Sequence, residues 1–320
     1  MTVTQAAQFE GAGNAAVQTE VWLLGQPHLR RYLDFVRDMT PGGASIRQAA
    51  LIDEWRAAND HYAELEATQA GIADDIDIRD LDPQMQAQAA EVVADPRYER
   101  AFEDLPARFA MVELDKLVVP QPHVNLHHVE RLKTRLAGPL APAGLFAFCM
   151  PLQRAEPPVH VRRTGARKYM FWSESSDFRF HEPAMLRAEN LTGYDSIGPV
   201  GGMIGLMVGF GSNFLTAIQS DDRLLLHNGH HRAYALRDAG FTHAPCLIQT
   251  VTRRDELNLI APGDVTEAPA FYFKAGRPPL LMDFFNPVLA RQHLVYKSQH
   301  MIELSFEVRN FEVRDLSSAG

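Results

Sequence analysis

Residues 222–251 read DRLLLHNGHHRAYALRDAGFTHAPCLIQTV, and this stretch decides the fold. Its apolar runs at 223–226 and 245–250 predict two strands. Between them, Asn228-Gly229 indicates a turn, and the pattern from Ala233 to Ala239 indicates a helix. Gly240 stands where a left-handed cap ends a helix. The stretch therefore predicts strand, glycine turn, helix and strand.

The corner between the first strand and the helix has the composition of an anion site. A helix that begins at or just after His231 directs its unpaired N–H groups and its positive dipole end into the turn. Gly229 has no Cβ, so the backbone can bend there and approach a ligand. Arg232 lies in the first helical turn, where the dipole disfavours a cation unless the guanidinium grips an anion. We expect phosphate binding by five consecutive residues: Asn228, Gly229, His230, His231 and Arg232. A plain strand–turn–helix with a surface arginine is the alternative.

A second block lies upstream, where residues 111–125 read MVELDKLVVPQPHVN. It predicts a strand ended by Pro120 and Pro122, followed by a short helix over 126–136. Histidine is concentrated in both blocks, at positions 123, 127, 128, 227, 230 and 231. If the blocks meet, His123, His230 and His231 are candidate acids or bases, because the pKa of an unperturbed histidine is near neutrality.

The two blocks resemble the ParB/sulfiredoxin superfamily (ParB N-terminal domain-like). Its Gly-x-x-Arg-x-x-Ala motif matches Gly229, Arg232 and Ala235, and its opening strand, proline turn and helix match 111–136. The resemblance implies an α/β (α+β) domain around a nucleoside triphosphate, with the Gly-x-x-Arg turn on the phosphates. It also places the turn from Pro120 to Asn125 near the nucleotide.

This chain departs from the superfamily at informative positions. Sulfiredoxins have a cysteine after the glycine, but this chain has His230, which argues against sulfinic-acid repair. The serine kinases of the superfamily have an aspartate before the glycine, and here the residue is Asn228. DNA-partitioning members continue into a helix-turn-helix, whereas 251–320 is proline-broken and ends in an alternating strand pattern at 302–308. The wide separation of the blocks implies an insertion at about 140–210.

The N-terminal part is acidic. Residues 1–112 carry 19 acidic and 9 basic side chains and no lysine, and 113–320 carry 21 and 22. Apolar spacing predicts helices in four segments, at 21–36, 45–71, 83–93 and 98–109. Asp74 to Asp82 then forms a solvated loop or, as the alternative, a metal site. The expected domains are an acidic helical region at 1–110, the nucleotide domain with its insertion at 111–250, and an extension at 251–320.

The insertion gives weaker signals. Strands are expected at 145–150, 158–162 and 169–172, and 173–199 has no firm period. Trp172 and the segment 173–183 are candidates for a lid. The run from Gly201 to Ser212 is either a buried glycine-rich strand and turn or a second phosphate loop.

Composition excludes several classes of protein. The apolar fraction of 46% and the charged fraction of 22% are those of a globular protein, and no apolar run resembles a membrane span or a signal peptide. Two cysteines, Cys149 and Cys246, form no disulfide framework, which favours the cytoplasm. With a net charge of −9 and no basic stripe, nucleic acid is a disfavoured partner.

We therefore expect an enzyme that binds a nucleoside triphosphate, ATP first, with Mg²⁺, and transfers or hydrolyses its γ-phosphate. It would act as a hydrolase, or as a phosphotransferase with a small-molecule or protein acceptor. Asp115, Glu130 and Asp222 are candidate magnesium ligands. The alternatives are a non-catalytic nucleotide sensor that binds a protein partner and, third, a ParB-like nuclease or DNA-partitioning factor.

Overall fold

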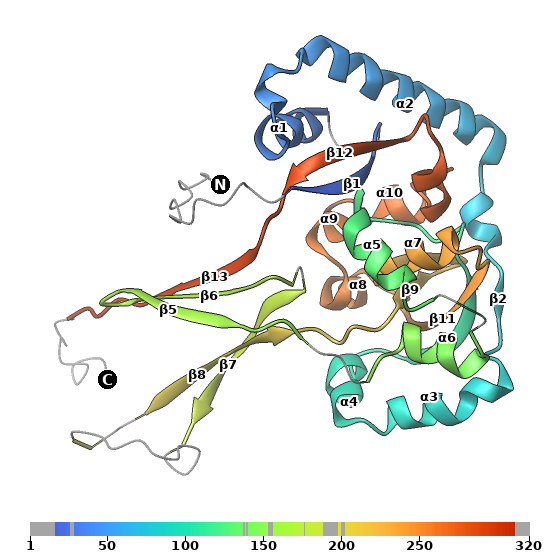
Figure 1. The fold of residues 1–320 in the computed structure, drawn as a ribbon. Coiled ribbons are helices and arrows are strands. Elements are labelled where there is room, and N and C mark those ends of the chain that lie inside the picture. Colours follow the sequence, from blue (N-terminus) through green and yellow to red (C-terminus); the bar gives the residue numbers. More distant parts are fainter. Residues whose placement is uncertain are drawn as a thin grey trace, which may run out of the picture. The chain divides into compact units, whose positions relative to one another are not determined.

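The computed structural model describes residues 17–25, 29–136, 138, 140–152, 156–175, 177–187, 198–199 and 202–310 (Figure 1). The chain is mixed α/β and divides into two compact units. The first unit comprises Met1–Gln153 with Ser212–Lys297, and the second comprises Arg154–Gly211 with Ser298–Gly320.

The strands of the first unit are β1 (Val17–Leu23), β2 (Ile78–Arg79), β3 (Ala107–Glu113), β4 (His123–Asn125), β9 (Thr216–Ser220), β10 (Arg223–Asn228), β11 (His243–Thr250) and β12 (Ala290–Tyr296). Its helices are α1 (Leu29–Met39), α2 (Gln48–Gln69), α3 (Gln86–Val93), α4 (Pro96–Phe102), α5 (Leu126–Lys133), α6 (Pro142–Cys149), α7 (His230–Asp238), α8 (Arg254–Ile260), α9 (Gly263–Glu267) and α10 (Pro269–Phe273). The second unit contains β5 (His160–Gly165), β6 (Lys168–Ser173), β7 (Phe178–Leu186), β8 (Met203–Phe210) and β13 (His300–Ser305).

A five-stranded sheet in the order β10-β9-β11-β3-β2 forms the centre of the first unit. β9 and β11 are parallel, and the other pairs are antiparallel. Successive side chains of a strand face opposite sides of a sheet. Leu224 and Leu226 belong to the main core with residues of α5, α6 and α7, whereas Leu225 belongs to a second core with residues of α8, α9 and α10. Both faces are covered, which explains why β10 has a continuous apolar run.

A three-stranded sheet, in the order β12-β1-β4, pairs the first strand of the unit in the sequence with its last. β1 is antiparallel to both neighbours and aligns Trp22 with His123. The prediction of a continuous helix from Val21 is wrong, because β1 occupies 17–23 and α1 starts only at Leu29. Between the two elements, Gly25 has a left-handed backbone conformation, with φ +78°. Short apolar runs fit both periods, and here the long-range strand pairing decides.

The expected domain boundaries differ from those of the compact units. β3 runs across residue 110 and pairs with both β2 and β11, so the acidic region and the predicted nucleotide domain share one sheet. The segment Arg154–Gly211 of the second unit falls largely within the expected insertion. The expected extension is divided, because β12 pairs with β1 and β13 pairs with β6.

Three local predictions in the insertion and extension are corrected. The apolar run at 145–150 lies in helix α6, which starts with Pro142 at its first turn, rather than in a strand. β8 forms the glycine-rich segment as a strand, but its residues are half-buried or exposed rather than buried; Gly201 lies outside the described residues. Helices α8 to α10 follow β11, in a region that the sequence analysis described only as broken by prolines.

A buried ion pair lies in the segment before β12, and helix α2 contacts it through Tyr62. Arg277 donates from Nη1 to Asp283 Oδ2 at 2.5 Å, and the two side chains are 1% and 2% exposed. Asp283 also accepts hydrogen bonds from the Tyr62 hydroxyl at 3.3 Å and from the Leu280 amide at 2.8 Å. Removing the carboxylate would leave a buried guanidinium without its counter-charge.

We predict that Asp283→Ala lowers the free energy of unfolding by about 3–5 kcal/mol, the cost of breaking a buried pair from one side. Chemical denaturation would measure it. Arg30→Ala, which removes an exposed contact to Asp34, is the control and should cost less than about 1 kcal/mol. Equal losses in the two variants would contradict the structural role of the pair.

Candidate phosphate-binding corner

Gly229 makes the turn between β10 and α7. Its φ of +90° is left-handed, and α7 begins at the next residue, His230. A Cβ at this position would lie 2.7 Å from Leu215 Cδ1 and 3.2 Å from Leu215 Cα. Glycine is thus required by conformation and by the approach of a neighbouring backbone. The sequence predicted the turn, but the close neighbour is Leu215.

The amides at the start of α7 point into this corner. The Gly229 carbonyl accepts the first helical hydrogen bonds, from the amides of Arg232 at 2.9 Å and Ala233 at 2.8 Å. The preceding amides, of His230 and His231, have no intrahelical acceptor by the geometry of a helix. The Asn228 side chain accepts from the Gly229 amide at 2.8 Å and fixes the turn. Free amides and the helix dipole make this end of α7 electropositive.

The two histidine blocks meet beside these amides. His123, on β4, stacks on Trp22 with ring centroids 4.6 Å apart. His230 is 7% exposed, and His123 and His227 both lie near enough to lower its pKa. Among the described residues, buried His123 Nδ1 and His230 Nε2 have no hydrogen-bond partner. His231 lies against His128, with ring centroids 5.0 Å apart, whereas His127 is exposed.

Burial keeps these imidazoles neutral. It lowers the pKa of His230 to about 3, with repulsion from His227 and His123 as the smaller causes. Burial also lowers the pKa of His231, with His128 next in effect. His123 has a lowered pKa for the same reason, partly offset by the nearby Glu20 carboxylate. A neutral imidazole donates one N–H and accepts with its other nitrogen, so each ring can still donate to an anion.

Arg232 faces the end of helix α6. It is 3% exposed, its Nη1 donates to the Cys149 carbonyl at 3.1 Å, and its guanidinium lies 5.8 Å from the centroid of the Phe148 ring. The Leu215 amide donates to the same carbonyl at 2.9 Å, and Asn228 Nδ2 donates to the Ser212 carbonyl at 3.0 Å. Cys149 and Ser212 are close to the points where the chain leaves and re-enters the first unit. Asn228 and Arg232 therefore fix the positions of the Ser212 and Cys149 carbonyls within the first unit.

The predicted magnesium ligands do not gather at the corner. Asp115 pairs with Arg237 at 2.8 Å, and Lys133 joins Glu130 to Asp238. These contacts lie at the C-terminal end of α7, opposite the corner. Asp222 precedes β10, whereas the corner follows it. Within the described ranges, no group of three or more His, Cys, Asp or Glu side chains is arranged to hold a metal ion.

No protein family, no curated protein and no solved structure matches this chain. In the part of the chain that is described, the structure also contains no helix with the length and apolarity needed to cross a membrane.

The sequence did not predict which residues from other parts of the chain contact the corner. Trp22 and Glu20 come from β1, which was taken for the start of a helix. Cys149 and Leu215 contribute a carbonyl and close packing rather than reactive side chains. The alternation of Val17, Thr19 and Val21 was the one available signal for β1.

We predict that Gly229→Ala destabilises the protein more than Gly240→Ala. Gly240 has nearly the same φ, +89°, but no atom lies within 4 Å of its Cβ position. Both variants acquire left-handed strain, which costs about 1–2 kcal/mol. Only Gly229→Ala also collides with Leu215. Urea denaturation measures the free energy of unfolding of each variant, and the difference between the two is the cost of the collision with Leu215. Equal losses of stability would show that Leu215 moves aside without a cost in free energy.

Neutral buried histidines also predict acid sensitivity. The folded pKa values of His230 and His293, about 3 and about 4, lie below the unfolded value of about 6.5. The unfolded state therefore binds more protons below pH 6.5, so stability is full above that pH and declines as the pH falls. Each such proton contributes a slope of about 1.4 kcal/mol per pH unit.

The measurement is the free energy of unfolding between pH 7 and pH 5, by denaturant titration. His230→Asn should lose one proton's share of the slope, and His127→Asn, at an exposed position on α5, should keep the parent slope. If the His230→Asn slope matches that of the parent, His230 is not held neutral.

Proposed function

We propose that the corner at Asn228 to Arg232 binds the phosphates of a nucleoside triphosphate, and that the chain is a divergent relative of the ParB/sulfiredoxin superfamily. The observation that carries this proposal is the buried Nε2 of His230, which has no hydrogen-bond partner among the described residues. An unsatisfied buried polar group costs about 1–3 kcal/mol, and such groups call for a functional explanation. A phosphate oxygen at the start of α7 would supply the missing partner.

The surroundings support an anion rather than a cation. The amides of His230 and His231 offer donors, and His123 Nδ1 is a second buried nitrogen without a partner in the described structure. Each neutral imidazole can donate its one N–H to a phosphate oxygen, while the helix end supplies positive potential. Phosphate recognition by backbone amides and neutral donors fits the residues that are present.

We propose transfer or hydrolysis of the γ-phosphate as the reaction, with Mg²⁺ entering on the nucleotide. Magnesium supplies charge neutralisation on the phosphates when it is bound. The lowered pKa values of His230 and His231 disfavour a role for these histidines as acids or bases. The contribution of this chain is therefore positioning and charge stabilisation, which dominate phosphoryl transfer.

A nucleotide sensor is the second candidate, and the contacts of Arg232 and Asn228 favour it. These side chains donate hydrogen bonds to the carbonyls of Cys149 and Ser212, which lie in the first unit near two of the three places where the chain passes between the units. A phosphate that competes for Arg232 or Asn228 would release these carbonyls and change the conformation of the segments that carry them. Phosphate release in many-fold excess over protein identifies an enzyme, and binding without turnover identifies a sensor.

We predict that His230→Ala weakens triphosphate binding by roughly tenfold to a hundredfold, since a hydrogen bond to a charged group is worth about 1.5–3 kcal/mol. Calorimetric titration with ATP and the other common triphosphates, each with Mg²⁺, would measure it. His127→Ala is the matched control, because His127 is exposed on α5 and lies outside the buried cluster. Its affinity should equal that of the parent.

Arg232→Ala should weaken binding to a similar extent, but this variant also loses the Cys149 contact and needs a parallel measurement of stability. Undiminished triphosphate binding by a folded His230→Ala variant, or by a folded Arg232→Ala variant, would contradict the phosphate corner.

A further inference from the structure

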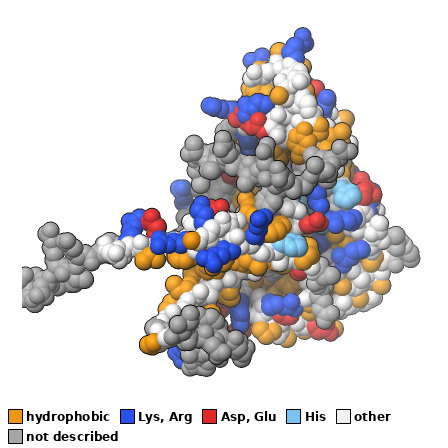
Figure 2. Space-filling model, turned by 60° about the vertical axis from the view of Figure 1, so that its left-hand side comes forward, with side chains coloured by type: hydrophobic (Ala, Val, Ile, Leu, Met, Phe, Trp, Pro, Cys, Tyr) orange, Lys and Arg blue, Asp and Glu red, His pale blue; other side chains and the backbone are white. Residues whose placement is uncertain are grey.

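The second unit exposes an unusual combination of charge and apolar surface. The hairpin of β5 and β6, residues 160–173, contains four cations (Arg162, Arg163, Arg167 and Lys168) and no acidic residue. β5 lies at the edge of the described sheet β13-β6-β5, and its first five residues are exposed. Figure 2 shows Lys and Arg side chains along this sheet with hydrophobic side chains beside them. We call this hairpin the basic arm.

Apolar side chains accompany these cations. Val161 on β5 is 61% exposed, and the neighbouring two-stranded sheet exposes Met185 and Ile204 by 75% and 66%. Two-stranded sheets are at best marginally stable in water, and exposed apolar clusters mark interaction sites. Arg163 is engaged with the carbonyls of its own turn, at 3.0 Å, and Lys168 pairs with Glu303 at 3.4 Å. Arg162 and Arg167 have no ion-pair partner among the described residues and are available to a partner.

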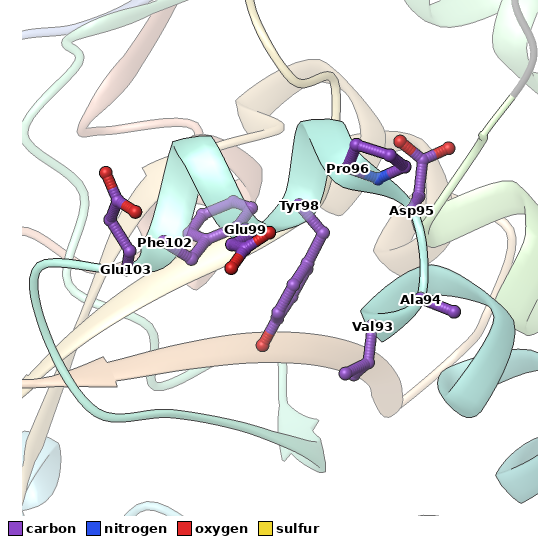
Figure 3. Close-up of a pocket in the computed structure, with 8 residues that line it drawn as sticks. All are labelled: Val93, Ala94, Asp95, Pro96, Tyr98, Glu99, Phe102 and Glu103. Carbon is purple, nitrogen blue, oxygen red and sulfur yellow. The ribbon is translucent and has the colours of Figure 1, made fainter.

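The complementary surface lies on the first unit, at helix α4. Its groove is lined by eight residues, which include three carboxylates and no Lys or Arg: Val93, Ala94, Asp95, Pro96, Tyr98, Glu99, Phe102 and Glu103 (Figure 3). Asp95 is neutralised by Arg97 at 2.6 Å. Glu99 and Glu103, four residues apart, are exposed and have no ion pair in the described part of the chain. Tyr98 and Phe102, with ring centroids 5.2 Å apart, provide an aromatic floor.

We propose that the basic arm of one copy of this chain docks in the α4 groove of a second copy. Guanidinium groups bind carboxylates in pairs of hydrogen bonds and stack on aromatic faces, so Arg162 and Arg167 fit a groove that offers both. Exposed Val161 and Val93 supply apolar contact beside the charges. The charge asymmetry of the sequence agrees, because residues 1–112 have a ten-charge excess of acidic side chains and the arm is wholly basic.

This contact joins different surfaces on the two copies. A contact of this kind leaves a free arm on one copy and a free groove on the other, so association continues into rings or open chains. The contact should also weaken with salt, because its charges are near the surface. An arm that packs on another arm would instead form a closed dimer.

The test is sedimentation of the full chain at about 0.05 M and 0.5 M salt, conditions that differ severalfold in screening length. The parent should sediment above its monomer mass of 35.8 kDa at low salt and as a monomer at high salt. Two variants that remove the charges, Arg162→Ala/Arg167→Ala and Glu99→Gln/Glu103→Gln, should each be monomeric at low salt. Arg254→Glu, at an exposed arginine outside the arm, should behave as the parent.

The decisive sample is an equimolar mixture of the two monomeric variants. One retains a working groove and the other a working arm, so the mixture should form a dimer and stop there. A mixture that stays monomeric, or a single variant that still associates, would overturn the proposal. So would a monomeric parent whose arm binds heparin or duplex DNA, since the partner would then be a nucleic acid. Thermal unfolding checks that each variant is folded.

Discussion

The left-handed turn at Gly229, pressed against Leu215, is the constraint on which the arrangement of the corner depends. A φ of +90° and a Cβ position 2.7 Å from Leu215 Cδ1 leave room for glycine alone. The turn starts α7 beside β4, which brings His230 to His123. It also places Asn228 and Arg232 against the carbonyls of Ser212 and Cys149. One backbone conformation thus assembles the histidine cluster and positions the side chains that bind the Ser212 and Cys149 carbonyls.

The same constraint was visible in the sequence because it is local. Strand β10, the turn, α7, the Gly240 cap and β11 follow from neighbouring residues, and the structure has all of them. β1 was mistaken for helix because its pairing with β4 and β12 joins residues more than 100 positions apart. α6 was mistaken for a strand because a fully apolar run has no period. The meeting of His123 with His230 was expected from the resemblance, whereas the hydrogen bond from Arg232 to Cys149 carried no sequence signal.

Burial is the property that separates this corner from a surface strand–turn–helix. A surface turn would leave its histidines hydrated and titrating near neutrality, but here burial lowers their pKa values and leaves two ring nitrogens without partners in the described structure. Folding alone does not favour such groups, because each costs free energy unless something binds it. The cost is consistent with a site whose last hydrogen bonds are made by a ligand.

Histidine-selective NMR tests the central claim, that the corner takes phosphate, most directly. The ring signals of His230 and His123 would be followed while a nucleoside triphosphate is added, with exposed His127 as the internal reference. The account predicts that both buried rings shift and saturate together, and that the corresponding nucleoside without phosphates leaves them unchanged. It would be contradicted if the triphosphate leaves the signals of both rings unmoved, or shifts the His127 signal alone.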